Sequence, residues 1–285
     1  MTHLPPPPLP DVILDPIVRL TLAEDLGRAG DLTTDATIPA DTQMKASIRA
    51  RQNATVAGLD AAAYALKLVD DSFKLAIAIG DGHKVIPGDT IATLEGPARS
   101  ILIAERPILN FVGRLSGVAT LTRAFADAIT HTPAKIVCTR KTTPGHRALE
   151  KRAVRCGGGT SHRYGLDDAI LIKDNHIAAC GSIEAALKRA HAYAGHLRMV
   201  EIEVDTLEQL EAALKGKPHA VLLDNMAPGT LREAVAMVDG QCTTEASGGV
   251  TLDTVDAIAE TGVDFISSGA LTHSAPNIDV GLDVV

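Results

Sequence analysis

The sequence is poor in aromatic residues and in long apolar runs. Only 2% of its 285 residues are Phe, Trp or Tyr, and none is Trp. Alanine, valine, isoleucine and leucine must therefore fill the core. No window approaches 18 uncharged apolar residues, and the N-terminus has no signal-peptide pattern, so we expect neither a membrane span nor secretion. These absences predict a cytoplasmic protein without membrane partners.

Cysteine is also scarce, and acidic residues outnumber basic ones. The four cysteines, Cys138, Cys156, Cys180 and Cys242, form no CxxC pair, so the sequence indicates neither a zinc site nor a redox pair. Reduced, buried thiols are typical of a cytoplasmic protein. The formal net charge of −8 and the isoelectric point near 5.7 argue against a nucleic-acid binder, whose domain is usually strongly basic.

From about residue 135 onward, the chain contains short apolar runs that alternate with amphipathic helical patterns. The six runs are "KIVCTR", "AILIK", "MVEIEV", "AVLLDN", "TTEASGG" and "DFISSG". Apolar strands that alternate with helices are typical of βα units in a parallel sheet. About six such units favour an α/β barrel over a doubly wound sheet.

The first part of the chain predicts a separate α+β domain. Strand and helix patterns are followed by a long helical stretch over 104–129 with an internal glycine-rich break. We place the boundary near residue 115, which gives an N-terminal domain over 11–115 and a barrel over 116–274. Four consecutive prolines in residues 1–10 predict an extended arm, and we favour a disordered tail over a docked segment.

Polar residues follow each apolar run at the position where the predicted strand ends. In chain order they are Arg140–Lys141, Lys173, Glu203, Asp224, the "SGG" of 247–249 and the "SSG" of 267–269. The carboxyl ends of barrel strands converge on one mouth, where the active sites of this architecture lie. The strand ends therefore predict cationic groups, two carboxylates and two small-residue turns around one site.

These residue types suit a site for anions. The backbone N–H groups of small-residue turns hold phosphate. Glu203 and Asp224 supply oxygen ligands for Mg²⁺ bound with a substrate phosphate; alternatively they stabilise a developing cation or neutralise Lys173. Arginine binds a carboxylate through two parallel hydrogen bonds. The arginines suited to a polycarboxylate are Arg140, Arg163 and Arg106, with His162 and His146 as further donors.

Residues 138–163 form a basic segment within this acidic chain. The segment carries seven Lys and Arg residues against one acid, Glu150, which is a local charge of +6. We interpret it as a receptor for an anionic substrate. Arg147, Lys151 and Arg152 are spaced around a predicted helix, so we expect them to form an exposed basic rim that attracts anions.

Long motifs along the chain resemble those of one known family. The motifs are "EDLGRAGDLTTDATIP", "AERPILNFVGRLSGVAT", "TRKTTPGHRALEKRAVRCGGGTSHRYGLDDAILIKDNH", "EIEVDTLEQL", "LLDNM", "EASGGV" and "ISSGALTHSAP". With them the chain closely resembles the quinolinate phosphoribosyltransferases, also called nicotinate-nucleotide pyrophosphorylases (carboxylating). The resemblance implies transfer of a phosphoribosyl group from phosphoribosyl pyrophosphate to quinolinate with loss of CO₂. The expected products are pyrophosphate and nicotinate mononucleotide, on the de novo route to NAD.

The resemblance also implies a fold, an assembly and a cofactor. The expected fold is an N-terminal α+β sandwich followed by an incomplete α/β barrel, with the C-terminal tail 275–285 returning to the first domain. The family forms homodimers in which the N-terminal domain of one subunit covers the barrel mouth of the other, so Arg106 would act across the interface. A hexamer is the alternative assembly, and Mg²⁺ is the implied cofactor.

Residue roles follow from the matching motif positions. Four residues match positions that bind the quinolinate carboxylates: Arg140, Lys141, His162 and Arg163. Lys173, Glu203 and Asp224 match positions around the ribose, the pyrophosphate and the metal, and we assign catalytic roles to them and to Lys141. The matches to the phosphate-holding turns are Ser247, Gly248, Gly249, Ser268 and Gly269, followed by His273.

Other functions are compatible with parts of the pattern. A paralogue of the same fold could transfer phosphoribosyl to another base, although nicotinate would engage only one carboxylate-binding group. A carrier module could use the "IPGDTIATLEG" hairpin, but the strand-end residues would then lack a role. A sugar-phosphate aldolase barrel would use a Schiff-base lysine, for which Lys173 is the candidate.

Overall fold

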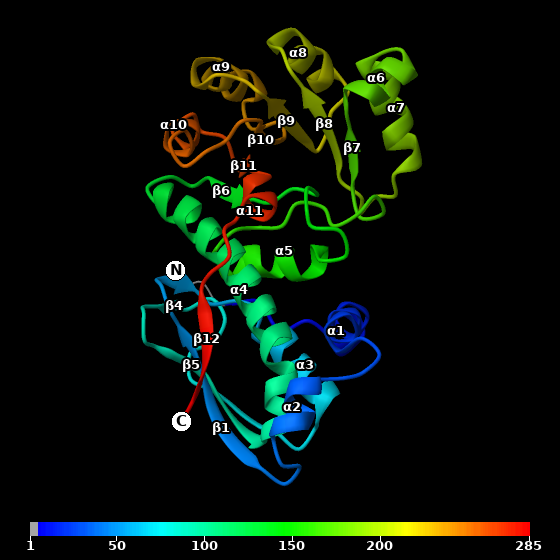
Figure 1. Cartoon of the computed structure of the whole chain (residues 1–285). Helices are drawn as coiled ribbons and strands as arrows, with labels where there is room; N and C mark the ends of the chain where they lie inside the picture. The colour runs from blue at the N-terminus through cyan, green and yellow to red at the C-terminus, as the bar shows by residue number, and fades with distance from the viewer. Residues whose placement is uncertain (1–4) are drawn as a thin grey trace. The chain divides into compact units, whose positions relative to one another are not determined.

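The computed structural model describes residues 5–285 and contains two compact units (Figure 1). The first unit combines the chain up to Arg123 with the segments Thr142–Gly158 and Leu271–Val285. The second unit comprises Ala124–Lys141 and Gly159–Ala270. Within residues 5–285, no helix is long and apolar enough to cross a bilayer.

The first unit is built on a four-stranded sheet in the order β12-β1-β5-β3, with every pair antiparallel. The strands of this sheet are β1 (Gln43–Ala50), β3 (Lys74–Ile77), β5 (Thr90–Pro97) and β12 (Val280–Val284). The unit also contains the short strands β2 (Ala54–Thr55) and β4 (Lys84–Val85). Strands β2 and β4 form a separate antiparallel pair. Strand β12 comes from the C-terminal tail, and it pairs with β1 along residues 280–284.

The helices of this unit are α1 (Asp11–Leu26), α2 (Leu32–Thr37), α3 (Leu59–Val69), α5 (Arg147–Cys156) and most of α4 (Ala98–Ala128). Helix α4 is continuous through the glycines that predicted a break. These glycines serve close packing instead. A Cβ on Gly117 would collide with the carbonyl oxygen of Pro276, and one on Gly113 would lie 2.8 Å from that of Ile278. The tail therefore lies directly against the backbone of α4.

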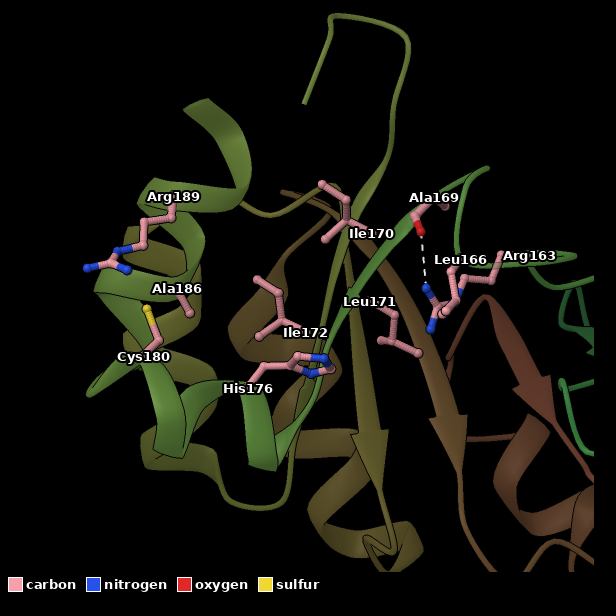
Figure 2. Close-up of a pocket in the computed structure, with 10 residues that line it drawn as sticks. All are labelled: Arg163, Leu166, Ala169, Ile170, Leu171, Ile172, His176, Cys180, Ala186 and Arg189. Atoms are coloured by element: carbon pink, nitrogen blue, oxygen red, sulfur yellow. Dashed lines mark hydrogen bonds between the residues drawn. The ribbon is translucent and has the colours of Figure 1, made fainter. Parts of the chain in front are cut away.

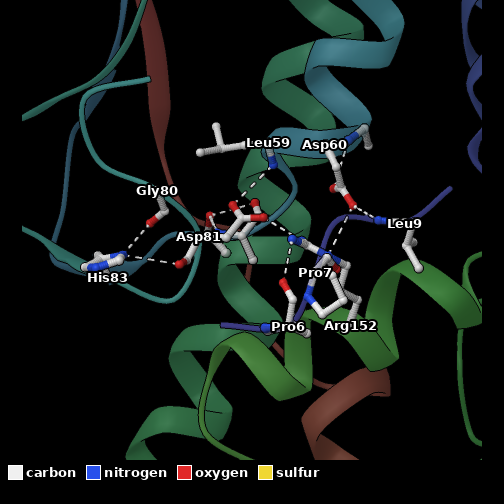
Figure 3. Close-up of polar contacts among 12 residues, drawn as sticks. Pro6, Pro7, Leu9, Leu59, Asp60, Gly80, Asp81, His83 and Arg152 are labelled. Atoms are coloured by element: carbon white, nitrogen blue, oxygen red, sulfur yellow. Dashed lines mark hydrogen bonds and ion pairs between the residues drawn. The ribbon is translucent and has the colours of Figure 1, made fainter. Parts of the chain in front are cut away.

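The proline arm is docked, so the prediction of a disordered tail is wrong for residues 5–10; residues 1–4 lie outside the described part. Pro6 is buried. Arg152 donates to the carbonyl oxygens of Pro7 at 3.0 Å and of Pro6 at 3.4 Å (Figure 3). The backbone N–H of Leu9 donates to Asp60 at 3.0 Å. Hydrogen bonds to its backbone hold the arm in place, although proline itself donates none.

The prediction of an exposed basic rim is also wrong for Lys151 and Arg152. Their exposed fractions are 0% and 7%, within helix α5. Arg152 pairs with Asp81 at 2.5 Å and with Asp60 at 3.2 Å, and both carboxylates are buried with it (Figure 3). Burying a charge is costly unless it is paired and hydrogen-bonded, and this arginine has both kinds of partner.

The second unit is a six-stranded parallel sheet in the order β6-β11-β10-β9-β8-β7. Its strands are β6 (Lys135–Val137), β7 (Ile170–Ile172), β8 (Val200–Val204), β9 (Ala220–Asp224), β10 (Thr243–Ser247) and β11 (Phe265–Ser267). Within the described residues, β6 and β7 each pair with one named strand only, so the sheet forms an incomplete α/β barrel. This agrees with the predicted fold.

Helices follow the strands of this sheet and lie along its outer side (Figure 1). They are α6 (Asp174–Cys180), α7 (Ile183–Tyr193), α8 (Leu207–Lys215), α9 (Pro228–Val238) and α10 (Val255–Ala259). The short α11 (Ala270–His273), which ends in the first unit, does not belong to this layer. In β8 the apolar residues Val200, Ile202 and Val204 are buried, whereas Glu201 and Glu203 are partly exposed. Because alternate strand residues face opposite sides, β8 turns its acids to the side away from these apolar residues.

Candidate active site

The polar strand ends of the barrel meet in one pocket of about 400 Å³. The residues that line the pocket are Thr139, Arg140, Lys141, His162, Arg163, Leu171, Lys173, Glu203, Leu222, Asp224, Glu245, Ser247 and Ser267. Six different strands or the loops after them contribute. The parallel register brings Ser247 of β10 directly beside Asp224 of β9. Eight of the predicted site residues thus lie together: six from the predicted strand ends, with His162 and Arg163 from the basic segment.

Two arginines form the basic wall of this pocket. Among the described residues, the buried Nε atoms of Arg140 and Arg163 have no hydrogen-bond partner. Burial, and then repulsion by Arg140, lower the pKa of the Arg163 guanidinium, against the attraction of Glu201 and Asp168. One terminal nitrogen of Arg163 donates to the carbonyl oxygen of Ala169 at 3.1 Å. The wall therefore carries desolvated positive charge with donor capacity left for an anion.

His162 is held between the backbone and two carboxylates. Its Nδ1 accepts from the backbone N–H of Arg163 at 2.8 Å. Its Nε2 lies 3.1 Å from Glu201 and 3.6 Å from Glu245. Because Nδ1 accepts a hydrogen bond, Nε2 carries the proton and donates toward the carboxylates. Both ring nitrogens of this predicted quinolinate donor thus contact protein groups.

The same three side chains have ligand atoms within 4.8 Å of one another, close enough to surround a cation. A metal on Nε2 would need the proton on Nδ1, where the Arg163 N–H already points. The observed hydrogen bonds therefore favour a proton between His162 and Glu201 over a metal ion. Sequence reasoning missed Glu201 and Glu245. Each lies two residues before a predicted site residue of the same strand, and this spacing places both residues on one face.

Lys173 and Glu203 form an ion pair across β7 and β8. This is one of the roles expected for Glu203. The backbone N–H of Lys173 donates to Nδ1 of His176 at 3.0 Å, so the first turn of α6 fixes the lysine backbone. The carboxylate of Glu203 is mostly buried, with 13% of its side chain exposed, whereas Lys173 is 44% exposed. Lys173 can therefore contact a bound anion while it stays near Glu203.

The two small-residue turns differ in how many of their hydrogen-bonding groups are already bonded to the protein. In the first, Gly248 and Gly249 adopt φ values of 91° and 60°, which glycine adopts readily. In the second, Ser268 is bonded to the protein: its N–H donates to Val137 and its hydroxyl to Val250. Ser267, which the sequence placed in the second turn without a binding role of its own, lines the pocket, and among the described residues its buried hydroxyl has no hydrogen-bond partner. Gly248, Gly249, Ser268 and Gly269 are not lining residues.

Three predicted residues belong to the first unit and are not among the residues that line the pocket. Arg106 is an exposed residue of α4. His273 is exposed and its Nδ1 lies 2.7 Å from the hydroxyl of Ser274. His146 precedes α5, and burial lowers the pKa of its imidazole although Glu150 raises it.

A second pocket of about 330 Å³ lies at the edge strand β7 (Figure 2). Strand β7 and helices α6 and α7 line it mainly with apolar side chains, and it shares Arg163 and Leu171 with the first pocket. Figure 2 shows the hydrogen bond from Arg163 to Ala169 at its border. Its lining contains no carboxylate, so it lacks the paired charges of the strand-end pocket.

Comparison with known proteins agrees with this geometry. The quinolinate phosphoribosyl transferase C-terminal domain matches residues 118–283, and the N-terminal domain matches residues 31–116. Nicotinate-nucleotide pyrophosphorylase [carboxylating] of Mycobacterium leprae is 45% identical over 272 residues, covering 94% of this chain and 95% of the relative. The probable enzyme of that name from Bacillus subtilis is 44% identical over 261 residues, with 92% and 90% covered.

A solved structure extends the likeness to three dimensions. The nicotinate-nucleotide pyrophosphorylase of Francisella tularensis superposes with a TM-score of 0.91 at 39% identity. The superposition covers 97% of this chain and 98% of the other. Two family domains, relatives above 40% identity and a shared whole-chain fold lead to one conclusion. The chain belongs to the quinolinate phosphoribosyl transferase family.

Proposed function

We propose that this protein transfers a phosphoribosyl group from phosphoribosyl pyrophosphate to quinolinate and releases pyrophosphate and CO₂. The product is nicotinate mononucleotide, which serves the de novo synthesis of NAD. The observation that carries the proposal is the pair of partly buried arginines, Arg140 and Arg163, whose buried Nε atoms have no hydrogen-bond partner among the described residues. They line the same pocket as the carboxylates of Glu203 and Asp224. Such a pocket suits a dianionic ring beside a phosphorylated sugar.

The basic wall supports quinolinate over a base with one carboxylate. Two arginines can each bind a planar carboxylate through parallel hydrogen bonds, and Lys141 adds a third positive group to the lining. A monocarboxylate such as nicotinate would leave one desolvated guanidinium without an anionic partner, which is costly. Transfer to another base by a same-fold paralogue is the alternative.

The acidic wall supports a phosphoribosyl pyrophosphate site that includes Mg²⁺. Glu203 and Asp224 present hard oxygen ligands from neighbouring strands, and Mg²⁺ is commonly bound by one or two carboxylates together with substrate phosphates. Bound there, the ion would neutralise charge on the pyrophosphate. Lys173, which lines the same pocket, would bind the same leaving group. The positive-φ glycines after Ser247 give a turn whose N–H groups suit the sugar phosphate.

The reaction divides into two steps. The bond from ribose C1 to pyrophosphate breaks, and the pyridine nitrogen forms a bond to C1 through an oxocarbenium-like transition state. Glu203 or Asp224 faces the developing positive charge, while Lys173 stabilises the departing anion. The bond between ring C2 and its carboxylate then breaks. Its electron pair stays on C2 beside the quaternary nitrogen until a proton is added. The protein's main task is to hold the ring and the sugar in line.

The assembly and location complete the proposal. A homodimer would let Arg106 of a second copy join the basic wall, and a hexamer of such dimers is the alternative. Arg106 is exposed on α4 and thus available for such a contact. The four cysteines are free thiols, which supports a cytoplasmic location because reducing compartments keep thiols free.

The decisive experiment supplies phosphoribosyl pyrophosphate and Mg²⁺ with either quinolinate or nicotinate. The CO₂ and the mononucleotide released are measured together. We expect one CO₂ per nicotinate mononucleotide from quinolinate and no turnover of nicotinate. Turnover of nicotinate alone, or of neither base by folded protein, would overturn the proposal in favour of the paralogue.

A further inference from the structure

Asn225 follows Asp224 at the end of β9 and adopts an uncommon backbone conformation. Its φ of 54° lies in the left-handed region, which few residues other than glycine adopt, although asparagine tolerates it better than most. Non-glycine residues in this region cluster at functional sites and persist where their surroundings hold them. Here the backbone N–H of Asn225 donates to the carbonyl oxygen of Ser247 at 2.9 Å.

The side chain of Asn225 contacts two parts of the candidate site. Its amide Nδ2 donates to Oδ2 of Asp224 at 2.6 Å. Its amide oxygen lies so close to Gly248 that a Cβ on this glycine would collide with it. The positive φ of Asn225 thus folds its side chain back between the carboxylate and the glycine turn. The turn can pack there because residue 248 has no side chain.

We propose that Asn225 is a positioning residue that holds the carboxylate of Asp224 and the Ser247–Gly249 turn in one arrangement. The backbone bond to Ser247 and the side-chain bond to Asp224 come from the same residue, so the two groups cannot move independently. This inference rests on the proposed function, in which Asp224 and the turn bind opposite ends of Mg²⁺-bound phosphoribosyl pyrophosphate. The quinolinate site of Arg140 and Arg163 involves neither contact.

The test compares Asn225→Gly with Asn225→Asp. Glycine keeps the positive φ but removes the amide. Aspartate also tolerates this conformation, but it removes the donor and places a second carboxylate beside Asp224. Binding of phosphoribosyl pyrophosphate with Mg²⁺ is measured by calorimetry, with quinolinate binding measured separately on the same protein. We expect Asn225→Gly to weaken phosphoribosyl pyrophosphate binding about fivefold and Asn225→Asp to weaken it further. Quinolinate affinity should be unchanged in both.

A double-mutant cycle separates positioning from a direct contact. Asn225→Gly keeps the backbone bond to Ser247 and loses the side-chain bond to Asp224. If Asn225 acts through Asp224, its effect on phosphoribosyl pyrophosphate affinity should therefore be clearly smaller in an Asp224→Ala background. An equal loss in both backgrounds would overturn the proposal, as would wild-type affinity in Asn225→Gly. Equal loss of affinity for both substrates would also overturn it, because it would indicate a general structural defect.

The outcome is also separable from the proposed function. If the wild-type protein does not bind phosphoribosyl pyrophosphate, the proposed function fails on its own. Crystal structures of the wild type and of Asn225→Gly then decide the positioning role. An altered Asp224 side-chain rotamer or an altered 247–249 turn in the variant would support it, and an unchanged site would overturn it.

Discussion

The chemistry of the pocket depends most on two arginines, each of which has one buried N–H group without a hydrogen-bond acceptor among the described residues. A buried donor without a partner is unfavourable in a folded protein, yet both Arg140 and Arg163 have such an atom in the described structure. The charge of Arg163 is also disfavoured: burial, and then the neighbouring Arg140, lower the pKa of its guanidinium. An anion that binds between them relieves both penalties.

Replacement of either arginine should therefore affect one substrate selectively. We expect Arg140→Ala and Arg163→Ala each to weaken quinolinate binding by about 10- to 100-fold, because each removes charge-assisted hydrogen bonds. Affinity for phosphoribosyl pyrophosphate should change little. Arg163→Lys is the matched control: it keeps the charge but loses the planar fork, so its affinity should be intermediate. Titrations that show equal weakening of both substrates would contradict the assignment.

At the scale of elements, sequence patterns predicted the features that depend on neighbouring residues in the chain, such as the strands and the residues at their ends. The apolar runs predicted the strands of the barrel, and most of the polar residues at their ends line the pocket, because strand direction alone sends all these ends to one edge. Helix α5 could not be predicted in the same way. Its charges indicated an exposed helix, but the partners that bury Arg152 are Asp60 and Asp81, roughly 70 to 90 positions earlier in the chain.

The same limit applies within the candidate site. The side-chain bond of Asn225 to Asp224 depends on a positive φ that composition does not reveal. Ser267 and Ser268 are adjacent and chemically alike, so only the fold determines which hydroxyl faces the pocket. Roles that depend on local backbone conformation or on distant partners therefore required the structure.

The Arg152 network should contribute strongly to stability. Arg152→Met leaves the carboxylates of Asp60 and Asp81 buried without their cation, and we expect a loss of about 3–5 kcal/mol in the free energy of unfolding. Deletion of residues 1–9 removes the hydrogen bonds of Pro6, Pro7 and Leu9 and the buried Pro6, and from these contacts a loss of about 1–3 kcal/mol is expected. Arg155→Met, at an exposed position of the same helix, should change stability by less than about 0.5 kcal/mol. Denaturant unfolding measures all three.

The penalty of Arg152→Met should also depend on pH. Burial raises the pKa of the Asp81 carboxyl in the wild type, even though Arg152 lowers it, so loss of the arginine raises this pKa further. When the pKa of a carboxyl is higher in the folded state than in the unfolded state, the protein loses stability as pH rises through the folded-state pKa. The stability difference between variant and wild type should therefore be largest near neutral pH and shrink on acidification toward pH 4. A constant difference would contradict the unpaired-carboxylate explanation.

At the scale of the whole molecule, neither unit is a continuous piece of chain. The first unit needs residues 142–158 and 271–285 as well as the N-terminal part, although the N-terminal family domain ends at residue 116. We expect a fragment of residues 1–116 to lack a cooperative thermal transition, because β1 would lose its partner β12 and Arg152 would be absent. Circular dichroism melting tests this. A sharp transition in the fragment would show that β12 and α5 are dispensable.

The pairing of β1 with β12 also determines when the sheet of the first unit can be completed during synthesis. Strand β12 spans residues 280–284, so it leaves the ribosome only after β1 and the whole barrel have been translated. Domains usually fold in order from the N-terminus as they are synthesised. Here the edge of β1 must wait, unpaired, for nearly the whole barrel to be translated, and an unpaired edge is prone to aggregation. A chain that ended between the barrel and β12 would leave the first unit, rather than the barrel, unfinished.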